Sequence, residues 1–301
     1  METEECAQAL HASGAGMSRV VYTSAPHISI GQLINPWSIA CNLLKHRELI
    51  AAYTKREFQS AHRGTYFGLA WSILSPLIML ALFTFVFGHI FGGKFNPKAH
   101  ETPAEFALAL FIGLGFFNGF AQSMGGASGL ITGNAHFVKS LAFPLEILPV
   151  SSVLNVLMNL VICITICLVA HLMMYGYLRI TSLALILHFI CIALIGLGIS
   201  WFLSGLSVFI RDVPALVPPI SIVLMFISGC FFPLSAMSPR IRALAEINPL
   251  AVIIDQARSA LMYGIWPDFT NLAYVFFLSL AVAIGGYCFF MKAKPAFADV
   301  I

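Results

Sequence analysis

Charged residues are scarce in this chain of 301 residues. Asp, Glu, Lys and Arg together make up 10% of the sequence, whereas 59% of the residues are hydrophobic. Because a soluble domain carries about a quarter charged residues, this chain has too little polar surface to cover an exterior that faces water. The formal net charge of +3 is also too small to indicate nucleic acid as a partner. The composition therefore predicts a membrane protein.

The sequence also lacks the motifs of several chemistries. It contains no GxxxxGK[ST] phosphate loop, no HExxH, no GxSxG and no pair of carboxylates on one predicted aqueous face. Its seven cysteines include no CxxC pair, so neither a zinc site nor a disulfide framework is indicated. Cys163 and Cys167 are expected simply to pack on one helix face. We therefore expect no catalytic residue, no metal site and no cofactor in this chain.

Ionisable residues are almost absent from the long apolar windows. Proton and ion pathways through membranes use such groups, and here His188 lies early in one window while Glu105 and Glu146 lie at window ends. We expect His188 to be a packed or interfacial residue. An ion-coupled transporter is therefore disfavoured, and so is a membrane-embedded glycan-modifying enzyme, which needs an acidic cluster. A channel or a translocator driven by another protein remains.

Six windows are long and apolar enough to cross a membrane, which takes about 20 residues. The predicted spans lie near residues 66–91, 105–127, 146–171, 182–209, 214–236 and 269–291. A helix satisfies its own backbone hydrogen bonds in lipid, and these windows lack the alternation of barrel strands, so we predict an all-α fold with six transmembrane helices. Six crossings leave both ends on one side. Lys and Arg concentrate on that side, which predicts that both termini are cytoplasmic.

A seventh segment, residues 35–62, is amphipathic. Asn35 and Pro36 form a favourable helix start, and apolar residues then recur at helical spacing. We predict an amphipathic helix in the cytoplasmic membrane interface, with a soluble helix packed on a partner as the alternative. Residues 1–34 before it are predicted to be a disordered or extended cytoplasmic N-terminus, and residues 63–301 form the six-span domain.

Residues 237–268 are too charged to span a membrane and too apolar for a solvated loop. Pro239 and Pro249 divide them into two short helical pieces. We predict a re-entrant helical hairpin on the outer face, between the fifth and sixth spans. It is either a lid or gate, or a packed structural hairpin.

Several segments resemble the type-2 ABC exporter permeases that export polysaccharides. The first is KREFQSAHRGTYFGLAWSILSPLIMLALFTFVFGHIF (55–91), whose matching positions are Arg56, Arg63, Gly64, Gly68, Trp71, Pro76, Phe87 and Gly88. FVKSLAFPLEILPV (137–150) resembles the inner coupling loop of that family. SGCFFPLSAMSP (228–239), NPL (248–250) and Arg258 resemble its fifth span and outer segment. The resemblance runs from about residue 35 to residue 292.

The resemblance implies a homodimer of six-span subunits in a bacterial inner membrane. Two cytosolic ATP-binding cassette subunits would complete the exporter and would hold its ATP and Mg²⁺. The implied substrate is an undecaprenyl-diphosphate-linked polysaccharide such as O antigen, a capsule-like chain or a teichoic acid. This chain would then be a transport subunit and not an enzyme. A related permease for a drug or a lipid has the same topology and stays open.

The same resemblance suggests roles for individual residues. Aromatic faces hold sugars through weak contacts, so the predicted conduit residues are Trp71, Phe83, Phe87, Phe226, Phe231 and Phe232, each of which is alternatively a lipid-facing or core residue. Arg63 is expected to contact the lipid diphosphate, or else to anchor the chain at the membrane surface. The predicted coupling residues are Arg56, Asn134, His136, Phe137 and Lys139. The predicted outer gate consists of Pro239, Asn248, Pro249 and Arg258.

Overall fold

The computed structural model describes residues 36–60, 66–86, 101–139, 143–231 and 247–301, with a few positions between 234 and 245. Its longer helices are α3 (Pro36–Lys45), α4 (Arg47–Ser60), α5 (Trp71–Phe83), α6 (Pro103–Ala127), α9 (Ile147–Tyr175), α10 (Leu185–Phe209), α11 (Val213–Ile227), α13 (Pro249–Arg258) and α14 (Phe269–Ala293). Shorter helices are α7 (Leu130–Gly133), α8 (Ala135–Val138) and α15 (Phe297–Val300). The described residues contain no strand, which confirms the all-α prediction for this part of the chain.

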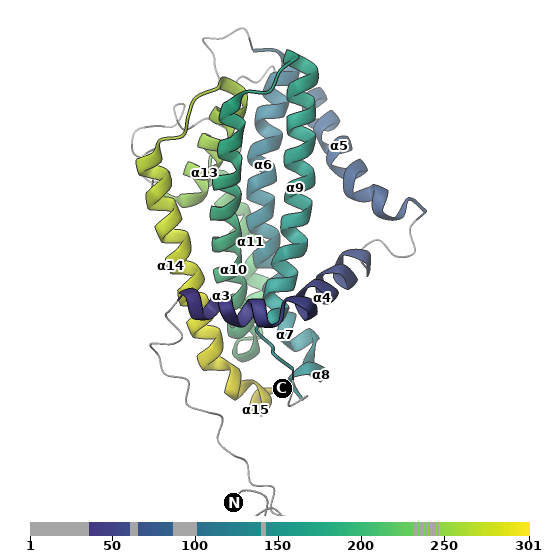
Figure 1. Ribbon diagram of the computed structural model, residues 1–301, viewed down its shortest axis with the longest axis vertical. Helices are drawn as coiled ribbons and strands as arrows, with labels where there is room; N and C mark the ends of the chain where they lie inside the picture. Colours follow the sequence, from purple (N-terminus) through teal and green to yellow (C-terminus); the bar gives the residue numbers. More distant parts are fainter. Residues whose placement is uncertain are drawn as a thin grey trace, which may run out of the picture.

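Four helical segments are long and apolar enough to cross a membrane. They are Pro103–Ala127, Ile147–Tyr175, Ile180–Phe209 and Phe269–Val300, and they correspond to the second, third, fourth and sixth predicted spans. The helices of these segments, α6, α9, α10 and α14, run side by side along the long axis of the molecule (Figure 1). They make the chain a multi-pass membrane protein by length and composition.

The first and fifth predicted spans contain shorter apolar helices within the described residues. These are Trp71–Val86 and Val213–Ile227. The remaining predicted residues of the two spans, 87–91 and most of 228–236, fall largely outside the described part of the chain. Six crossings therefore stay a prediction.

The bundle helices begin and pack as their sequences dictate. Thr102 caps α6 in a capping box with Glu105, and Asp268 caps α14 by accepting from Thr270 N–H. Gly198 of α10 faces Gly286 of α14, and a Cβ atom at either position would overlap the backbone of the other helix. This close approach is the usual way in which membrane helices maximise their packing.

The segment predicted as one interfacial helix is two helices, α3 and α4, which adjoin at His46. Both lie across one end of the bundle, which we call the α3 end (Figure 1). Ile39 and Ile50 are buried in a cluster with Trp201 and Phe290, because these apolar side chains share the stripe that faces the bundle. The location of the two helices in a membrane interface stays a prediction, and residues 1–35 lie outside the described residues.

Candidate coupling, gating and translocation sites

Glu146 joins four elements at the α3 end. The residue is buried, and its Oε2 lies 2.6 Å from Nζ of Lys294, which follows α14. Asn42 of α3 donates to Glu146 Oε1 at 3.3 Å and to the Tyr287 hydroxyl at 3.0 Å. Trp201 of α10 donates its indole N–H to the Glu146 carbonyl at 3.1 Å. Glu146 therefore ties α3 to α9, α10 and α14.

Opposing effects act on the Glu146 carboxyl. Burial raises its pKa, but the nearby Lys294 ammonium and the hydrogen bonds lower it, and the net pKa lies below the usual range for Glu. The carboxylate is thus ionised at neutral pH and pairs with Lys294. If either residue of the pair is replaced by a neutral one, the charge of the other residue is left without a counter-charge.

The predicted coupling residues cluster where α4 meets α7 and α8. Tyr53 of α4 donates its hydroxyl to Asn134 Oδ1 at 3.2 Å, and its ring lies edge-on to Phe137 at a centroid distance of 6.0 Å. His136, Lys139 and Arg56 are exposed. The geometry therefore links Asn134 and Phe137 to α4 and leaves the side chains of His136, Lys139 and Arg56 on the surface.

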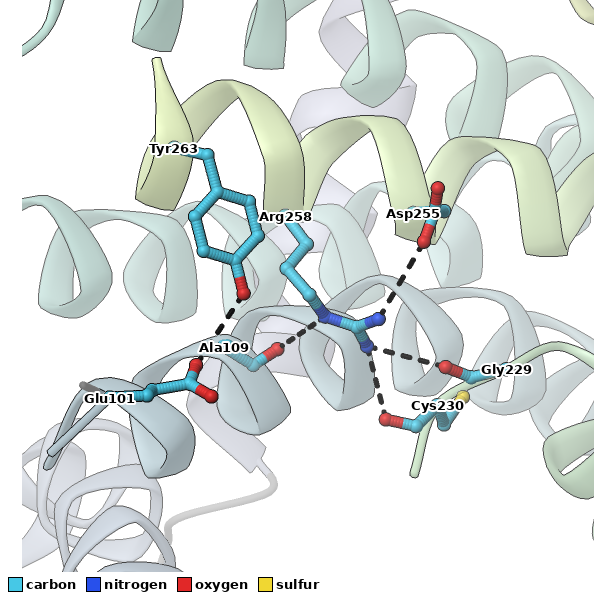
Figure 2. Close-up of polar contacts among 7 residues, drawn as sticks. All are labelled: Glu101, Ala109, Gly229, Cys230, Asp255, Arg258 and Tyr263. Carbon is cyan, nitrogen blue, oxygen red and sulfur yellow. Dashed lines mark hydrogen bonds and ion pairs between the residues drawn. The ribbon is translucent and has the colours of Figure 1, made fainter. Parts of the chain in front are cut away.

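Arg258 occupies the centre of a buried polar network (Figure 2). Arg258 is only 2% exposed, so protein groups replace water as its hydrogen-bond partners. Its Nε donates to the carbonyl of Ala109 at 3.0 Å. Its Nη2 donates to the carbonyls of Gly229 at 3.3 Å and Cys230 at 3.1 Å, and Asp255 lies 4.0 Å from Nη1. The guanidinium therefore binds α13 to α6 and to the turn after α11.

The start of α13 is bound to the same turn. Asn248 caps the helix by accepting from Leu250 N–H, and its Nδ2 donates to the Ser228 hydroxyl at 3.1 Å. Pro249 takes the first helical position, where its missing N–H costs nothing. Both ends of α13 thus contact residues 228–230, so three of the four predicted gate residues lie around one turn. Pro239 lies outside the described residues.

Two cavities follow the facing sides of α6 and α9. One, of about 220 Å³, lies between these helices and α5, with Ser75 and Phe83 of α5 in its wall. The other, of about 500 Å³, lies between the same helices, α4 and α11. Both include Gln122 and Val156, so they adjoin. We call the two cavities together the α6–α9 groove.

Glu57 of α4 lies at the wall of the second cavity. Burial raises the pKa of its carboxyl above the usual range. The groove therefore begins beside a carboxyl group of α4 and leads along α6 and α9 toward α5.

The predicted conduit residues are not all brought together. Phe83 lines the groove, whereas Trp71, at the start of α5, contacts Phe67 at a centroid distance of 5.7 Å. Phe226 of α11 is 56% exposed and lies 5.6 Å from the ring of Phe231. Phe87, Phe232 and the predicted diphosphate contact Arg63 lie outside the described residues. The conduit assignment stays a prediction.

Comparison with known proteins decides the family. A family model described as "ABC-2 type transporter" matches residues 48–262, which include α4 except Arg47, the other groove helices and the whole of α13. The chain belongs to the ABC-2 type transporter family. The resemblance seen in the sequence is thereby confirmed at the level of the family.

Proteins with known names are similar to this ABC-2 transporter over almost their full length. An "O-antigen export system permease protein RfbA" of Myxococcus xanthus is 24% identical over 263 residues, which cover 86% of this chain and 97% of that protein. A protein of the same name from Klebsiella pneumoniae is 26% identical over 257 residues, or 84% of this chain and 95% of that protein. The similarity thus extends over most of this chain.

Two features of this ABC-2 transporter were not predicted from its sequence. One is the Glu146 network, for which a Glu directly before one span and a Lys at the end of another was the available signal. The other is the groove, whose polar residues recur at helical spacing in two of the long apolar windows.

Among the described residues no group of His, Cys, Asp and Glu is arranged to hold a metal ion.

Proposed function

We propose that this chain is the membrane-spanning permease of an ATP-driven exporter that moves a lipid-linked polysaccharide such as O antigen out of the cytoplasm. The observation that carries the proposal is the near full-length similarity to permeases named for O-antigen export. Membership of the ABC-2 family supports it, because such permeases work with separate ATP-binding subunits. The chain contains no phosphate loop, so ATP and Mg²⁺ belong to the partner.

In the proposed exporter, two copies of this chain assemble with two ATP-binding cassette subunits. The α3 end faces the cytoplasm of a bacterial inner membrane, with both termini on that side, since Lys and Arg concentrate there. Helices α5 and α11 belong to the first and fifth of six crossings, and α13 belongs to a re-entrant segment on the outer face.

In this proposal, movement of the ATP-binding subunit is transmitted to this chain through α4, α7 and α8. The exposed His136, Lys139 and Arg56 meet the ATP-binding subunit, and Tyr53 passes displacement to α4 through Asn134 and Phe137. The Glu146 network carries it onward from α3 into three bundle helices. At the opposite end, α13 gates the exit by its attachment to residues 228–230.

ATP hydrolysis by the complete exporter in proteoliposomes tests this function. The probe is lipid-linked polysaccharide extracted from the source strain, and undecaprenyl phosphate without a glycan is the control. We expect the glycan-bearing lipid to stimulate hydrolysis, and Arg63→Ala to lower the stimulation while leaving membrane insertion intact. Equal hydrolysis with and without the glycan-bearing lipid would contradict the proposal.

A further inference from the structure

Four amide side chains line the α6–α9 groove in regular positions. Asn118 and Gln122 lie four residues apart on α6, and Asn155 and Asn159 lie four residues apart on α9. Residues four apart lie on one face of a helix, about one turn from each other. Each helix therefore presents two amides to the groove, one above the other.

The packing of α6 against α9 determines which amides of the two helices lie opposite each other along the helix axes. A Cβ atom at Gly115 would meet Cys163, one at Gly119 would meet Leu160, and one at Gly126 would meet Ser152. This antiparallel register places Asn118 level with Asn159. It likewise places Gln122 level with Asn155, so the groove has two amide tiers.

The amides lack partners within the part of the chain that the structure describes. The hydrogen bonds among the described residues include none from the side chains of the two tiers, and Asn155 Oδ1 is buried without a donor. Leaving the Asn155 oxygen unpaired costs roughly 1–3 kcal/mol. Asn155 and Asn159 are half-buried and Asn118 and Gln122 are exposed, so the amides are open to a molecule in the groove, and polar groups within membrane helices generally mark a pathway. Two tiers of unpaired amides thus indicate a ligand that supplies donors and acceptors together.

We propose that the two tiers bind the hydroxyl groups of the polysaccharide as it passes along the groove, a proposal that rests on the function given above. An amide and a hydroxyl each donate and accept, so they pair in either orientation along a chain of varied sugars. The amides carry no charge, and their hydrogen bonds are individually modest, so they hold the chain without trapping it. Phe83 and Phe111 in the same wall add aromatic contacts for the sugar rings.

Photo-crosslinking identifies what occupies the groove while the amides stay intact. A benzophenone side chain replaces Met79, which lines the groove on α5, in cells that contain the ATP-binding subunits and produce the polysaccharide. The matched control replaces Met158, an exposed methionine of α9 outside the groove lining. We expect a glycan-bearing adduct from position 79 and none from position 158. An adduct of position 79 only with lipid, or only with a second copy of this chain, overturns the proposal.

Export measurements then test the amides themselves. In the variant Gln122→Leu/Asn155→Leu, one tier loses its hydrogen bonds, and we expect surface polysaccharide to fall about tenfold. The swapped variant Gln122→Asn/Asn155→Gln keeps amides in the tier and should retain most export. Thr165→Val, a polar-to-apolar change elsewhere on α9, is the control. Each variant is compared at equal recovery of the assembled exporter.

The outcomes separate this inference from the proposed function. If wild-type protein with its ATP-binding subunits exports no polysaccharide, the function itself fails. If wild-type protein exports it, yet the leucine variant exports equally and position 79 yields no glycan adduct, only the amide tiers are refuted.

Discussion

The ammonium of Lys294 lies 2.6 Å from a carboxylate oxygen of Glu146, although 148 residues separate them in sequence. The pair joins the residue before α9 to the residue after α14, and Asn42 of α3 donates to the same carboxylate. The Glu146 side chain is 6% exposed and that of Lys294 is 29% exposed. The pair is thus shielded enough to hold α3 in one position relative to the bundle.

Replacing Glu146 by Gln should destabilise the protein, because Lys294 then lies in a mostly buried site without a counter-charge. We expect a loss of about 2 kcal/mol, below the cost of breaking a fully buried pair because Lys294 is partly exposed. Thermal unfolding of the purified exporter in detergent measures the change. Lys294→Met should lower the unfolding temperature similarly, whereas Lys292→Met, which changes an exposed lysine two residues away, should not. Equal effects of the two lysine variants would contradict this role.

The same pair predicts a pH dependence. The pKa of Glu146 is lower in the folded protein than in the unfolded chain, so its stabilisation is present above the unfolded pKa of about 4.3. It is lost as the pH falls through the lower folded value. The difference in unfolding temperature between wild type and Glu146→Gln should therefore be constant from about pH 7 to pH 5 and shrink below about pH 4. A difference that grows on acidification would contradict the assignment.

Gly113 makes room for Arg258. A Cβ atom at Gly113 would lie 2.7 Å from Arg258 Nη2 and 3.1 Å from Ile254 Cγ2, so Gly113→Ala should displace the guanidinium from its carbonyl acceptors. We expect a destabilisation of about 2 kcal/mol and faster proteolysis around α13. Gly125→Ala on the same helix is the control, since no described atom lies within 4 Å of a Cβ there. If both variants behave alike, Arg258 does not depend on this space.

The contact between Tyr53 and Asn134 should matter for transport more than for folding. Tyr53→Phe keeps the ring against Phe137 and removes only the hydrogen bond to Asn134. We expect export to fall roughly threefold, as for the loss of one hydrogen bond, with unchanged recovery of the assembled exporter. Tyr53→Ala should reduce export further because the ring contact is lost as well. Wild-type export by Tyr53→Ala would exclude this contact from coupling.

The features that were predicted correctly from the sequence depend on the residues of one continuous segment. Four of the six expected spans are long apolar helices, and His188 is a packed residue as expected, fully buried with its Nδ1 2.7 Å from the Ala184 carbonyl. Asn248 and Pro249 start α13 as their residue types suggest. These features follow from local composition, capping preference and the cost of polar groups in lipid.

What escaped prediction depends on residues that are distant in sequence. The partners of Glu146 come from α3, α10 and the end of α14, and no local pattern specifies which ends of which helices meet. The same is true of the amide tiers, whose alignment depends on the antiparallel register set by Gly115, Gly119 and Gly126. Asn118 and Gln122 were visible as an i, i+4 pair, but only the position of α9 gives that pair a partner tier.

Surface polysaccharide in a strain that lacks this gene and the gene of its ATP-binding partner tests the central claim most directly. We expect the polysaccharide to return only when both genes are restored, and not when the restored partner has an inactivated phosphate loop. In the strain whose partner has the inactivated phosphate loop, the polysaccharide should accumulate inside the cell in its lipid-linked form. Export restored by this chain alone would contradict the account.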